Sequence, residues 1–574
     1  MWPDHFLVTC LVLLALWILI SGIDDLFVSA VFFLTRKPFR WPHPSRLVAE
    51  RERRIAILVP LWREHRVIGR MLAHNLASIR YCSYDIFVGV YPNDDVTTLA
   101  VREAARRYPN VHAINVPHAG PTSKGDCLNW TYRGMADFEK RRGVRFDIVM
   151  THDAEDLVHP DSLRLVNWYA RDYQMVQVPV LPLPTPTREL LHGIYCDEFA
   201  EFQTKDIPVR QRLGGFLPAN GVGTGFGRDA LEHLAATRGG QIFDPACLTE
   251  DYENGLRLHA LGYRQIFLPL RFQQGKPVAT REYFPRTFHA AVRQRSRWVA
   301  GITLQGWQHH GWRGNWREVY WFWRDRKGLV GNLLSPFANL AFLAGLFRWP
   351  WHGMAYPGWV ASVCGATCSI AIVQMAIRAW CAARIYGWRF AAAVPLRTAC
   401  GNVVNFCATV AAVHQFTAAR LHRVSMAWRK TDHVYPKPRL GEILVRLRAL
   451  EVTAVEAAAA QLPRGVRLGE YLIEREQLPE DSVYRALSLQ FEIPLGPTHR
   501  GEIDRTATRI LPAATARRWN VLPYRVRQGK LHVATSDVPS PRLKRELARM
   551  CRLEIRYHLV GPGRFQDLVR EYLP

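Results

Sequence analysis

Paired cysteines are missing from this sequence. It has 11 cysteines in 574 residues, an odd number, and no CxxC pair. Six of them lie in or beside apolar segments, where cysteine behaves as a small hydrophobic residue. These six are Cys10, Cys364, Cys368, Cys381, Cys400 and Cys407. We therefore predict no disulfide framework and place the soluble parts of the chain in a reducing compartment.

No lysine or arginine precedes the first apolar run, Phe6–Leu34, which only Asp24-Asp25 interrupts. A cleaved signal peptide is the competing explanation, but it needs a basic start and a small-residue cleavage site. Phe6–Gly22 alone supplies about 17 apolar positions, the lower limit for a membrane span. We therefore predict an uncleaved N-terminal anchor over residues 1–35, with the acidic pair near the membrane interface.

Acidic residues are also scarce, because 50 Asp and Glu stand against 75 Lys and Arg, a net charge of +25. Nucleic acid binding would explain such an excess, but the cations gather at the ends of apolar segments. Those that do so are Arg36, Lys37, Arg40, Arg46, Arg51, Arg53, Arg54, Arg423, Arg429, Lys430, Lys437 and Arg439. Cations in such positions hold a chain on the cytoplasmic face and attract anionic lipid. We therefore predict a membrane protein that binds no nucleic acid.

Three further apolar segments, Leu329–Phe347, Pro357–Ile377 and Thr398–Ala418, occupy residues 326–420. The third also carries polar side chains, Asn402, Asn405 and His414. If the domains on either side are both cytoplasmic, an even number of spans must separate them. We therefore predict that the first two segments span the membrane and that residues 378–418 are interfacial or re-entrant, with their polar groups facing protein.

Between residues 50 and 325, strand and helix signals alternate. The short apolar runs Ile55–Val59, Ile86–Val90 and Asp147–Met150 are separated by helical stretches such as Val67–Ser78 and Asp95–Tyr108. Buried strands separated by helices predict an α/β domain with a mainly parallel sheet covered on both faces. Ligands in such domains bind beyond the carboxyl ends of the strands.

Two acidic groups directly follow strands and should meet in that crevice: Asn93-Asp94-Asp95 and His152-Asp153-Ala154-Glu155-Asp156. Divalent Mg²⁺ prefers carboxylate oxygens together with substrate phosphate. Asp153 and Glu155, two residues apart on one loop, could bind the same ion, and Asp156 is a rival for the second place. The alternative is an acidic loop that caps a helix beginning near Asp161.

Two more motifs complete a site for transfer from a nucleotide diphosphate sugar. Asp251, in Thr249-Glu250-Asp251, is the candidate base for the acceptor hydroxyl, although the triplet could merely start a helix with Thr249 as N-cap. Gln294, Arg297 and Trp298 share one helical face, where arginine would bind phosphate and tryptophan would stack on a sugar. Arginine and tryptophan beside a membrane are otherwise interface anchors.

Two further groups fit such a site. Lys124 is a second candidate diphosphate contact, and the glycine-rich run Gly221–Gly225 would let the backbone approach a substrate.

These blocks, in this order, resemble the family 2 inverting glycosyltransferases of the cellulose and hyaluronan synthase type over residues 50–325. The resemblance implies a GT-A-type fold and Mg²⁺ or Mn²⁺ on Asp153 and Glu155, the latter where many relatives have Asp. It implies Asp251 as base and acceptor contacts from Glu250 and Trp298. The donor and its diphosphate would be bound by Glu64, Asp94, Lys124, Asp126, Gln294 and Arg297.

The sequence around the motifs is similar to that of the NfrB-type phage-adsorption proteins of bacterial inner membranes. The similar segments are Leu58–Glu64, Tyr91–Asp94, Gly120–Lys124, His152–Asp156 and Trp323–Gly328. This resemblance implies a UDP-N-acetylhexosamine donor such as UDP-N-acetylmannosamine and activation by cyclic di-GMP. It also implies an outer-membrane partner that exports the polymer or presents it to phage.

The tail, residues 436–574, contains an internal near-repeat. Arg439-Leu440-Gly441-Glu442 and Arg467-Leu468-Gly469-Glu470 lie 28 positions apart, and apolar residues recur in step after each. This pattern predicts two short helical units, followed by a strand at Lys530–Thr535 and a terminal helix at Gly563–Tyr572 in an α+β domain.

The tail resembles the MshEN domain of type II secretion and pilus ATPases, which binds cyclic di-GMP. By that resemblance the ligand would contact Arg439, Leu440, Gly441, Arg467, Leu468, Gly469, Gln490 and Asp537. The mid-motif glycine of the family is replaced by Arg448 and Glu476. The alternative is a folded adaptor that no longer binds the dinucleotide.

We therefore predict a multi-pass inner-membrane glycosyltransferase with cytoplasmic catalytic and C-terminal domains. Its substrates would be a UDP-sugar and a glycan or lipid-linked acceptor, and its product a secreted or cell-surface polysaccharide. Three rivals stay open: a cellulose- or hyaluronan-type synthase, single-sugar transfer to a lipid carrier, and a catalytically silent scaffold that binds cyclic di-GMP.

Overall fold

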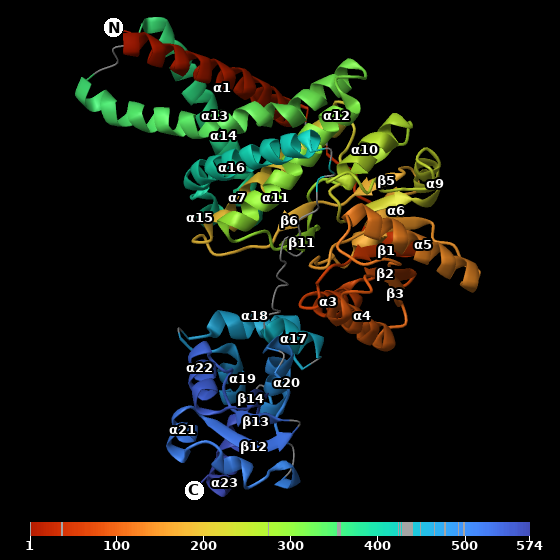
Figure 1. Cartoon of the computed structure of the whole chain (residues 1–574), viewed down its shortest axis with the longest axis vertical. Coiled ribbons are helices and arrows are strands. Elements are labelled where there is room, and N and C mark those ends of the chain that lie inside the picture. The colour runs from red at the N-terminus through yellow and green to blue at the C-terminus, as the bar shows by residue number, and fades with distance from the viewer. Residues whose placement is uncertain are drawn as a thin grey trace. The chain divides into compact units, whose positions relative to one another are not determined.

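The structure is a computed structural model, and it describes residues 2–35, 38–273, 275–352, 357–422, 424, 426, 440–447, 449–463, 465–475, 478–491, 493–497, 500–527 and 529–573. The chain divides into two compact units, Met1–Tyr435 and Pro436–Pro574, and each is described here by itself (Figure 1).

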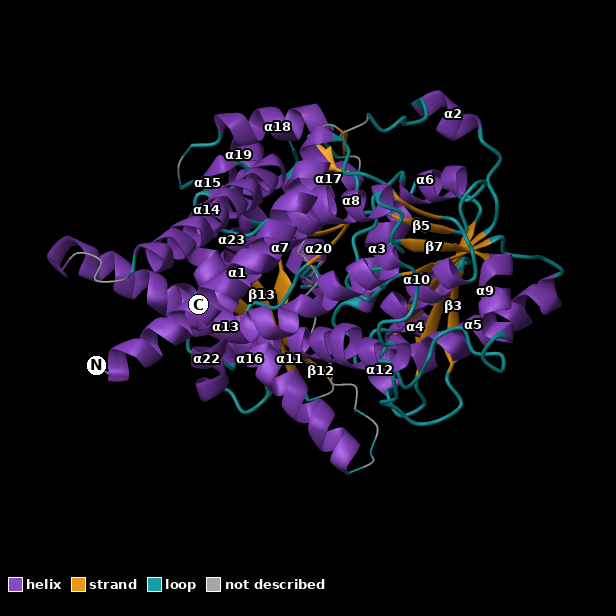
Figure 2. Ribbon diagram, turned by 90° about the horizontal axis from the view of Figure 1, so that it is seen from above, coloured by secondary structure: helices purple, strands orange, loops and turns teal. Residues whose placement is uncertain are grey.

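A seven-stranded sheet of order β3-β2-β1-β4-β7-β5-β8 forms the centre of the first unit. Its strands are β1 (Ile55–Pro60), β2 (Tyr84–Val90), β3 (Val111–Asn115), β4 (Ile148–Thr151), β5 (Met175–Gln177), β7 (Thr224–Gly227) and β8 (Gln265–Phe267). Every neighbouring pair is parallel except those of β7, which runs antiparallel to β4 and β5. The predicted mainly parallel sheet is confirmed, and Figure 2 shows its strands among helices.

Helices cover both faces of this sheet because alternate side chains of each strand point to opposite sides. Ile57, Val88 and Met150 pack in one cluster with α3 (Ile68–Ser78), α4 (Asp95–Arg107) and α6 (Ser162–Tyr169). Leu58 and Phe87 pack in the other. The helices of that second cluster are α5 (Lys124–Arg142), α8 (Ile207–Arg212), α9 (Arg228–Ala236) and α10 (Glu250–Ala260).

A second group of elements lies between the sheet and the long apolar helices. Its helices are α7 (Leu190–Glu201), the π-helix η1 (Phe202–Asp206), α11 (Phe288–Trp298), the π-helix η2 (Val299–Gln305) and α12 (Gly306–His310). Its strands are β6 (Val180–Pro182) with its parallel partner β11 (Thr280–Glu282), and the hairpin β9 (Phe272–Gln273) and β10 (Lys276–Pro277). A short helix, α2 (Pro44–Ala49), precedes β1.

Within the described residues, four helices are long and apolar enough to cross a membrane. They are α1 (Trp2–Leu34), α13 (Trp316–His352), α14 (Gly358–Tyr386) and α16 (Val394–Leu421), and the short α15 (Trp388–Ala391) lies before the last. In Figure 1, α1, α13 and α14 extend away from the sheet. The predicted segments are therefore helices, and residues 378–386 continue α14 rather than starting a separate interfacial segment.

The last of these helices, α16, packs on α7, α11 and α13 through polar contacts. Arg397 is fully buried, and its Nε lies 2.6 Å from Oδ2 of Asp197 on α7. Asn405 accepts a hydrogen bond of 2.6 Å from Arg295 on α11, and Asn402 donates one of 3.0 Å to Asn339 on α13. Both asparagines face protein as predicted. His414 does not, because it lies on the exposed face of the helix.

The acidic pair in the first apolar helix is neutralised by two cations of α13. Oδ2 of Asp24 lies 2.5 Å from Nη1 of Arg324 and 2.7 Å from Nζ of Lys327. Asp25 lies 2.7 Å from Lys327. Charges beside a bilayer are expensive unless they pair, so these contacts hold α1 against α13.

The second unit contains two helical pairs and a small sheet. The pairs are α17 (Leu440–Arg446) with α18 (Val452–Gln461) and α19 (Leu468–Glu474) with α20 (Glu480–Phe491), which confirms the predicted repeat. The sheet, β12-β13-β14, comprises β12 (Val521–Arg527), β13 (Lys530–Thr535) and β14 (Glu554–Leu559). The other helices are the 3₁₀ turns η3 (Arg500–Glu502) and η4 (Ala507–Arg509), and α21 (Ala513–Arg518), α22 (Pro541–Met550) and α23 (Pro562–Tyr572).

Candidate active site

A cleft opens beside the carboxyl ends of β1 and β4. Eight of the residues predicted from sequence line it. They are Glu64, Lys124, Asp153, Glu155, Asp251, Gln294, Arg297 and Trp298. These residues come from five separate segments of the chain, so the fold brings the separate sequence motifs into one place.

The turn after β4 is held by a buried pair. His152 and Asp156 are at most 1% exposed, and Nδ1 of the imidazole lies 2.7 Å from Oδ2 of the carboxyl group. The same oxygen accepts a 3.0 Å hydrogen bond from the backbone N–H of Asp153. Burial raises the pKa of Asp156. Asp156 therefore shapes the turn, while Asp153 and Glu155 line the cleft.

Lys124 begins α5 and is placed by a helix cap, since the hydroxyl of Ser123 accepts a hydrogen bond from the N–H of Asp126. Its Nζ lies 2.7 Å from Oδ1 of Asp153. Burial opposes the charge, but the carboxylates of Asp153, Glu250 and Asp251 outweigh it and raise the pKa of Lys124. A permanent cation therefore lies beside the candidate metal-binding carboxylate.

Asp251 lies in the first turn of α10, after Thr249 at the N-cap position, as the sequence predicted. The side chain of Thr249 makes no capping hydrogen bond. The carboxylate of Asp251 instead accepts a 2.9 Å bond from the N–H of Tyr252. Burial raises the pKa of Asp251, and burial with repulsion from Asp251 raises the pKa of Glu250 to about 7. A raised pKa makes a carboxylate a better proton acceptor.

Gln294, Arg297 and Trp298 lie on one face of α11 and all three line the cleft. Oε1 of Gln294 is buried and has no hydrogen-bond partner within the part of the chain that is described. The indole of Trp298 packs among Tyr195, Phe199 and Phe284, with ring centroids 6.0–6.4 Å apart.

An adjoining face of α11 is anchored by Arg295. Its Nη1 lies 2.8 Å from Oε2 of Glu198 on α7 and donates to Asn405 on α16. Its guanidinium also lies 4.3 Å from the ring centroid of Tyr195. Arg295 therefore joins three helices behind the residues that line the cleft.

Sequence reasoning missed Glu282, which lies at the end of β11 and lines the cleft. Its carboxyl group hydrogen-bonds that of Glu155, and burial, followed by repulsion from Asp156 and Asp153, raises the pKa of Glu282 well above its usual range. Two carboxyl groups share a hydrogen bond only when one holds a proton. No motif marks Glu282, since it is brought to the cleft by the pairing of β11 with β6.

The carboxyl groups of Asp153, Glu155 and Glu282 thus line the same cleft. This oxygen-rich set fits a hard divalent cation, which would relieve the repulsion between them.

Three predicted donor or acceptor residues do not line the cleft. Asp94 caps α4 and accepts a 2.5 Å hydrogen bond from the N–H of Arg63. Asp126 accepts one of 2.8 Å from Thr122, and Glu250 is 4% exposed beside Asp251. Their roles in binding remain predictions.

In the second unit, the two RLG motifs contact one another. A Cβ placed on Gly469 would lie 3.1 Å from Cδ2 of Leu440, and one on Gly441 would lie 3.6 Å from Cδ2 of Leu468. Nη1 of Arg467 lies 3.3 Å from Oδ1 of Asp537, and both side chains are largely exposed. Gln490 is the last residue but one of α20. Arg439, Arg448 and Glu476 lie outside the described residues.

Comparison with known proteins assigns both units. Residues 52–301 match glycosyltransferase like family 2, and residues 491–574 match the MshEN domain. Bacteriophage adsorption protein B of Escherichia coli K12 is 32% identical over 97% of this chain and 81% of the relative. The chain belongs to this family. It is therefore a membrane-associated family 2 glycosyltransferase with a C-terminal MshEN domain.

Two solved structures are similar to separate parts of the chain. The mannosyltransferase PcManGT of Pyrobaculum calidifontis, in complex with GDP-Man and Mn²⁺, shares 18% identity with a TM-score of 0.45 and covers 70% of this chain and 99% of that one. MshE with bound cyclic di-GMP shares 26% identity with a TM-score of 0.22 and covers 24% of this chain and 99% of that one.

Proposed function

We propose that this protein is an inverting glycosyltransferase that transfers an N-acetylhexosamine from its UDP-linked form to a growing cell-surface or secreted polysaccharide. One observation carries the proposal: Lys124, Asp153 and Asp251 meet in the cleft that Gln294, Arg297 and Trp298 also line. A silent scaffold would have no use for a base, a carboxylate set and two cations arranged together.

The residues of this chain divide into those that bind the diphosphate and those that act on the acceptor. Asp153, Glu155 and Glu282 would hold Mg²⁺ or Mn²⁺, which when bound offsets the charge that develops on the leaving diphosphate. Lys124 and Arg297 bind the same phosphates from two sides. Trp298, held by its aromatic neighbours, supports the acceptor sugar.

In the chemical step, the acceptor hydroxyl attacks the anomeric carbon on the face opposite the diphosphate. A new carbon–oxygen bond forms as the bond to the diphosphate breaks, and UDP leaves with the electron pair. The hydroxyl proton passes to Oδ2 of Asp251, whose raised pKa suits it to accept the proton as attack proceeds. The backbone of Gly221 lies close to this carboxylate.

Parity and the burial of α16 support a membrane topology for the chain. We propose that α1, α13 and α14 cross the inner membrane, and that α16 lies at the interface against the catalytic unit. A third of the most apolar window of α16 is buried within the protein, against none for α13 and 11% for α14. With two spans between them, the catalytic and MshEN domains are both cytoplasmic, where cyclic di-GMP and UDP-sugars are found.

Cyclic di-GMP is the proposed activator, bound by the two RLG motifs with Arg467, Gln490 and Asp537. The contact between Leu440 and Gly469 joins the motifs into one surface, and Arg467 and Asp537 extend it with a charged pair. The relationship to bacteriophage adsorption protein B supports a role in phage adsorption through an outer-membrane partner that exports or presents the polymer.

The experiment that tests this function is UDP release by membranes that contain the protein. UDP-N-acetylglucosamine, UDP-N-acetylgalactosamine and UDP-N-acetylmannosamine are supplied separately with Mn²⁺, with and without cyclic di-GMP. We expect one donor to release UDP into a polymeric product, and more of it with the dinucleotide.

The other outcomes separate the rivals. UDP-glucose as the preferred donor would favour a cellulose-type synthase, and a lipid carrying one sugar would favour single transfer. No release from any donor by a protein that binds cyclic di-GMP would favour the scaffold.

A further inference from the structure

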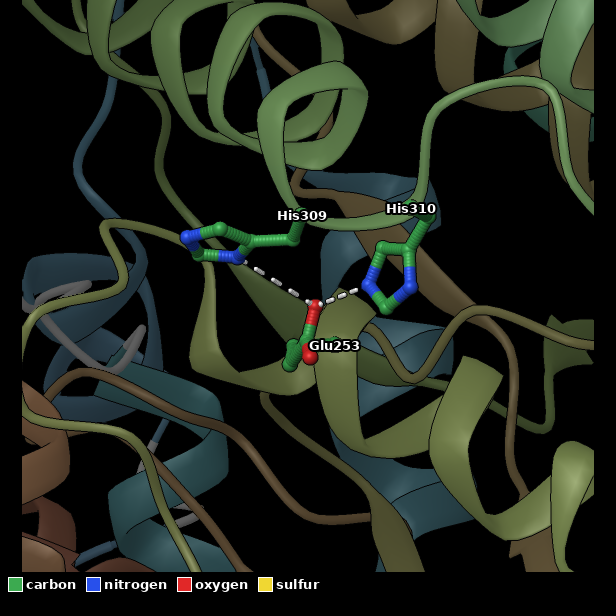
Figure 3. Close-up of side chains that lie close together, drawn as sticks. All are labelled: Glu253, His309 and His310. Carbon is green, nitrogen blue, oxygen red and sulfur yellow. Dashed lines mark hydrogen bonds and ion pairs between the residues drawn. The ribbon is translucent and has the colours of Figure 1, made fainter.

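A cluster of metal-ligating side chains lies outside the cleft. Glu253 on α10 faces His309 and His310 on α12, and Figure 3 shows the two imidazole rings on either side of the carboxylate. Oε2 of Glu253 lies 2.7 Å from Nε2 of His310 and 4.0 Å from Nδ1 of His309. None of the three residues lines the cleft, so the cluster is separate from the carboxylates that would hold Mg²⁺ or Mn²⁺.

We propose that Glu253, His309 and His310 bind a borderline transition-metal cation of the Zn²⁺ class. Two imidazole nitrogens and one carboxylate oxygen are a set that Zn²⁺ uses, whereas Mg²⁺ prefers oxygen ligands alone. All three ligand atoms lie within 4.8 Å of one another. Tetrahedral Zn²⁺ separates its nitrogen and oxygen ligands by about 3.3 Å. The two separations from Oε2 of Glu253, 2.7 Å and 4.0 Å, lie on either side of this value. Each ligand atom would therefore have to move by less than about 1 Å to reach it.

The surroundings orient the ligands. Oε1 of Glu253 accepts a 3.0 Å hydrogen bond from Nη2 of Arg238, which leaves Oε2 to face the imidazoles. Nη1 of Arg238 is itself bound by Asp244 at 2.6 Å, so its charge is offset. The ring of His310 stacks on Phe322 with centroids 6.3 Å apart and planes within 13°. Contacts of this kind fix the orientation of the side chains that bind the metal directly.

The position of the cluster gives the cation a structural role. Glu253 lies two residues after Asp251 on α10, and α12 continues directly from α11 and η2, which carry Gln294 and Arg297. A bound cation would therefore join the helix of the proposed base to the helix run of the proposed diphosphate-binding residues.

The test measures metal binding rather than activity, so its failure is distinguishable from failure of the proposed function. The full-length protein, without a polyhistidine tag, is purified in detergent and stripped with EDTA. Excess Mg²⁺ is then added to occupy oxygen-ligand sites, and Zn²⁺ is titrated by calorimetry. Co²⁺ is titrated in parallel, because its visible absorption bands report nitrogen ligation.

We expect one equivalent of tightly bound Zn²⁺ in the natural protein, in Asp153→Asn and in His259→Ala. His259 is the matched control, because it is a histidine on α10 that lies beside Glu318 of α13. The double variant His309→Ala/His310→Ala and the single variant Glu253→Gln should lose it. His309→Ala alone, on a side chain 31% exposed, should weaken binding at least tenfold without unfolding the protein. Equal binding by the double variant, or no binding by the natural protein, would overturn the proposal.

Discussion

Gly221 lies against Asp251, which lines the candidate active site: a Cβ on Gly221 would lie 2.6 Å from Oδ2 of Asp251. Gly221 also has a φ of +75°, a conformation that other residues adopt only with strain. No side chain therefore fits between this backbone and the proposed base.

The contact predicts that Gly221→Ala will lower kcat by roughly 10²-fold, because displacement of a catalytic group by about 1 Å has an effect of that size. Steady-state UDP release measures it. Gly239→Ala is the matched control, since Gly239 has a φ of +58° and nothing within 4 Å of its Cβ position. Equal activities of the two variants would show that the contact with Asp251 is irrelevant.

The raised pKa of Glu250 should make the stability of the protein depend on pH. Its pKa in the folded protein is about 7, above the ordinary 4.5, so the folded state holds the proton more tightly than the unfolded state. This group therefore destabilises the protein as pH rises from 4.5 through 7, by at most about 3 kcal/mol. Glu250→Gln should raise Tm at pH 8 and leave it nearly unchanged at pH 5 in thermal unfolding experiments. A Tm gain that is the same at both pH values would contradict the raised pKa.

We expect Glu282 to be a third carboxyl group that takes part in metal binding. Glu282→Gln keeps the shape and a hydrogen bond to Glu155 but cannot ionise to bind a cation. We expect the Mn²⁺ concentration for half-maximal activity to rise about 10- to 100-fold, the range for residues that support metal ligands. Glu232→Gln, which removes a carboxylate at the surface beside Arg228, serves as the control. An unchanged Mn²⁺ requirement in Glu282→Gln would remove this residue from the metal site.

We expect the contacts of Arg295 with α7 and α16 to hold α11 in position. Arg295→Lys retains the charge but removes the guanidinium, whose Nη1 contacts both Glu198 and Asn405. We expect kcat to fall about 10-fold while binding of UDP, measured by calorimetry, changes little. Arg293→Lys is the control on the same helix, where the side chain is exposed. Loss of UDP affinity in Arg295→Lys would instead indicate a direct contact with the donor.

In the second unit, Pro436–Pro574, we expect Arg467 to contribute to the affinity for cyclic di-GMP. Arg467→Ala removes both the guanidinium and its contact with Asp537. We expect the Kd for cyclic di-GMP to rise at least about 10-fold by calorimetry, since hydrogen bonds to charged groups contribute about 1.5–3 kcal/mol. Arg485→Ala, an exposed arginine on α20, should bind as the natural protein does. Equal Kd values for the two variants would place the ligand elsewhere.

Much of the fold could be predicted because its signals are local. The apolar runs of β1, β2 and β4 and the polar loops after them indicate a parallel sheet directly. The same reasoning placed Asp153 at its carboxyl edge, and the 28-residue repeat predicted the helical pairs of the tail.

Other parts depend on contacts between distant segments. Glu282 reaches the cleft only because β11 pairs with β6, and sequence spacing carries no trace of that pairing. Asp156 and Glu155 are adjacent and chemically alike, so only the buried bond from His152 separates their roles. Residues 394–421 read as an ambiguous apolar segment until the partners of Arg397 and Asn405 are known.

The most direct test of the central claim compares the natural protein with Asp251→Asn in membranes supplied with the preferred UDP-N-acetylhexosamine, Mn²⁺ and cyclic di-GMP. UDP binding by the purified variant is measured alongside. We expect the variant to bind UDP with nearly unchanged Kd and to release UDP from the sugar donor at least about 10³-fold more slowly. Donor turnover by Asp251→Asn at the natural rate would contradict it, because the proton of the acceptor hydroxyl would then have another destination.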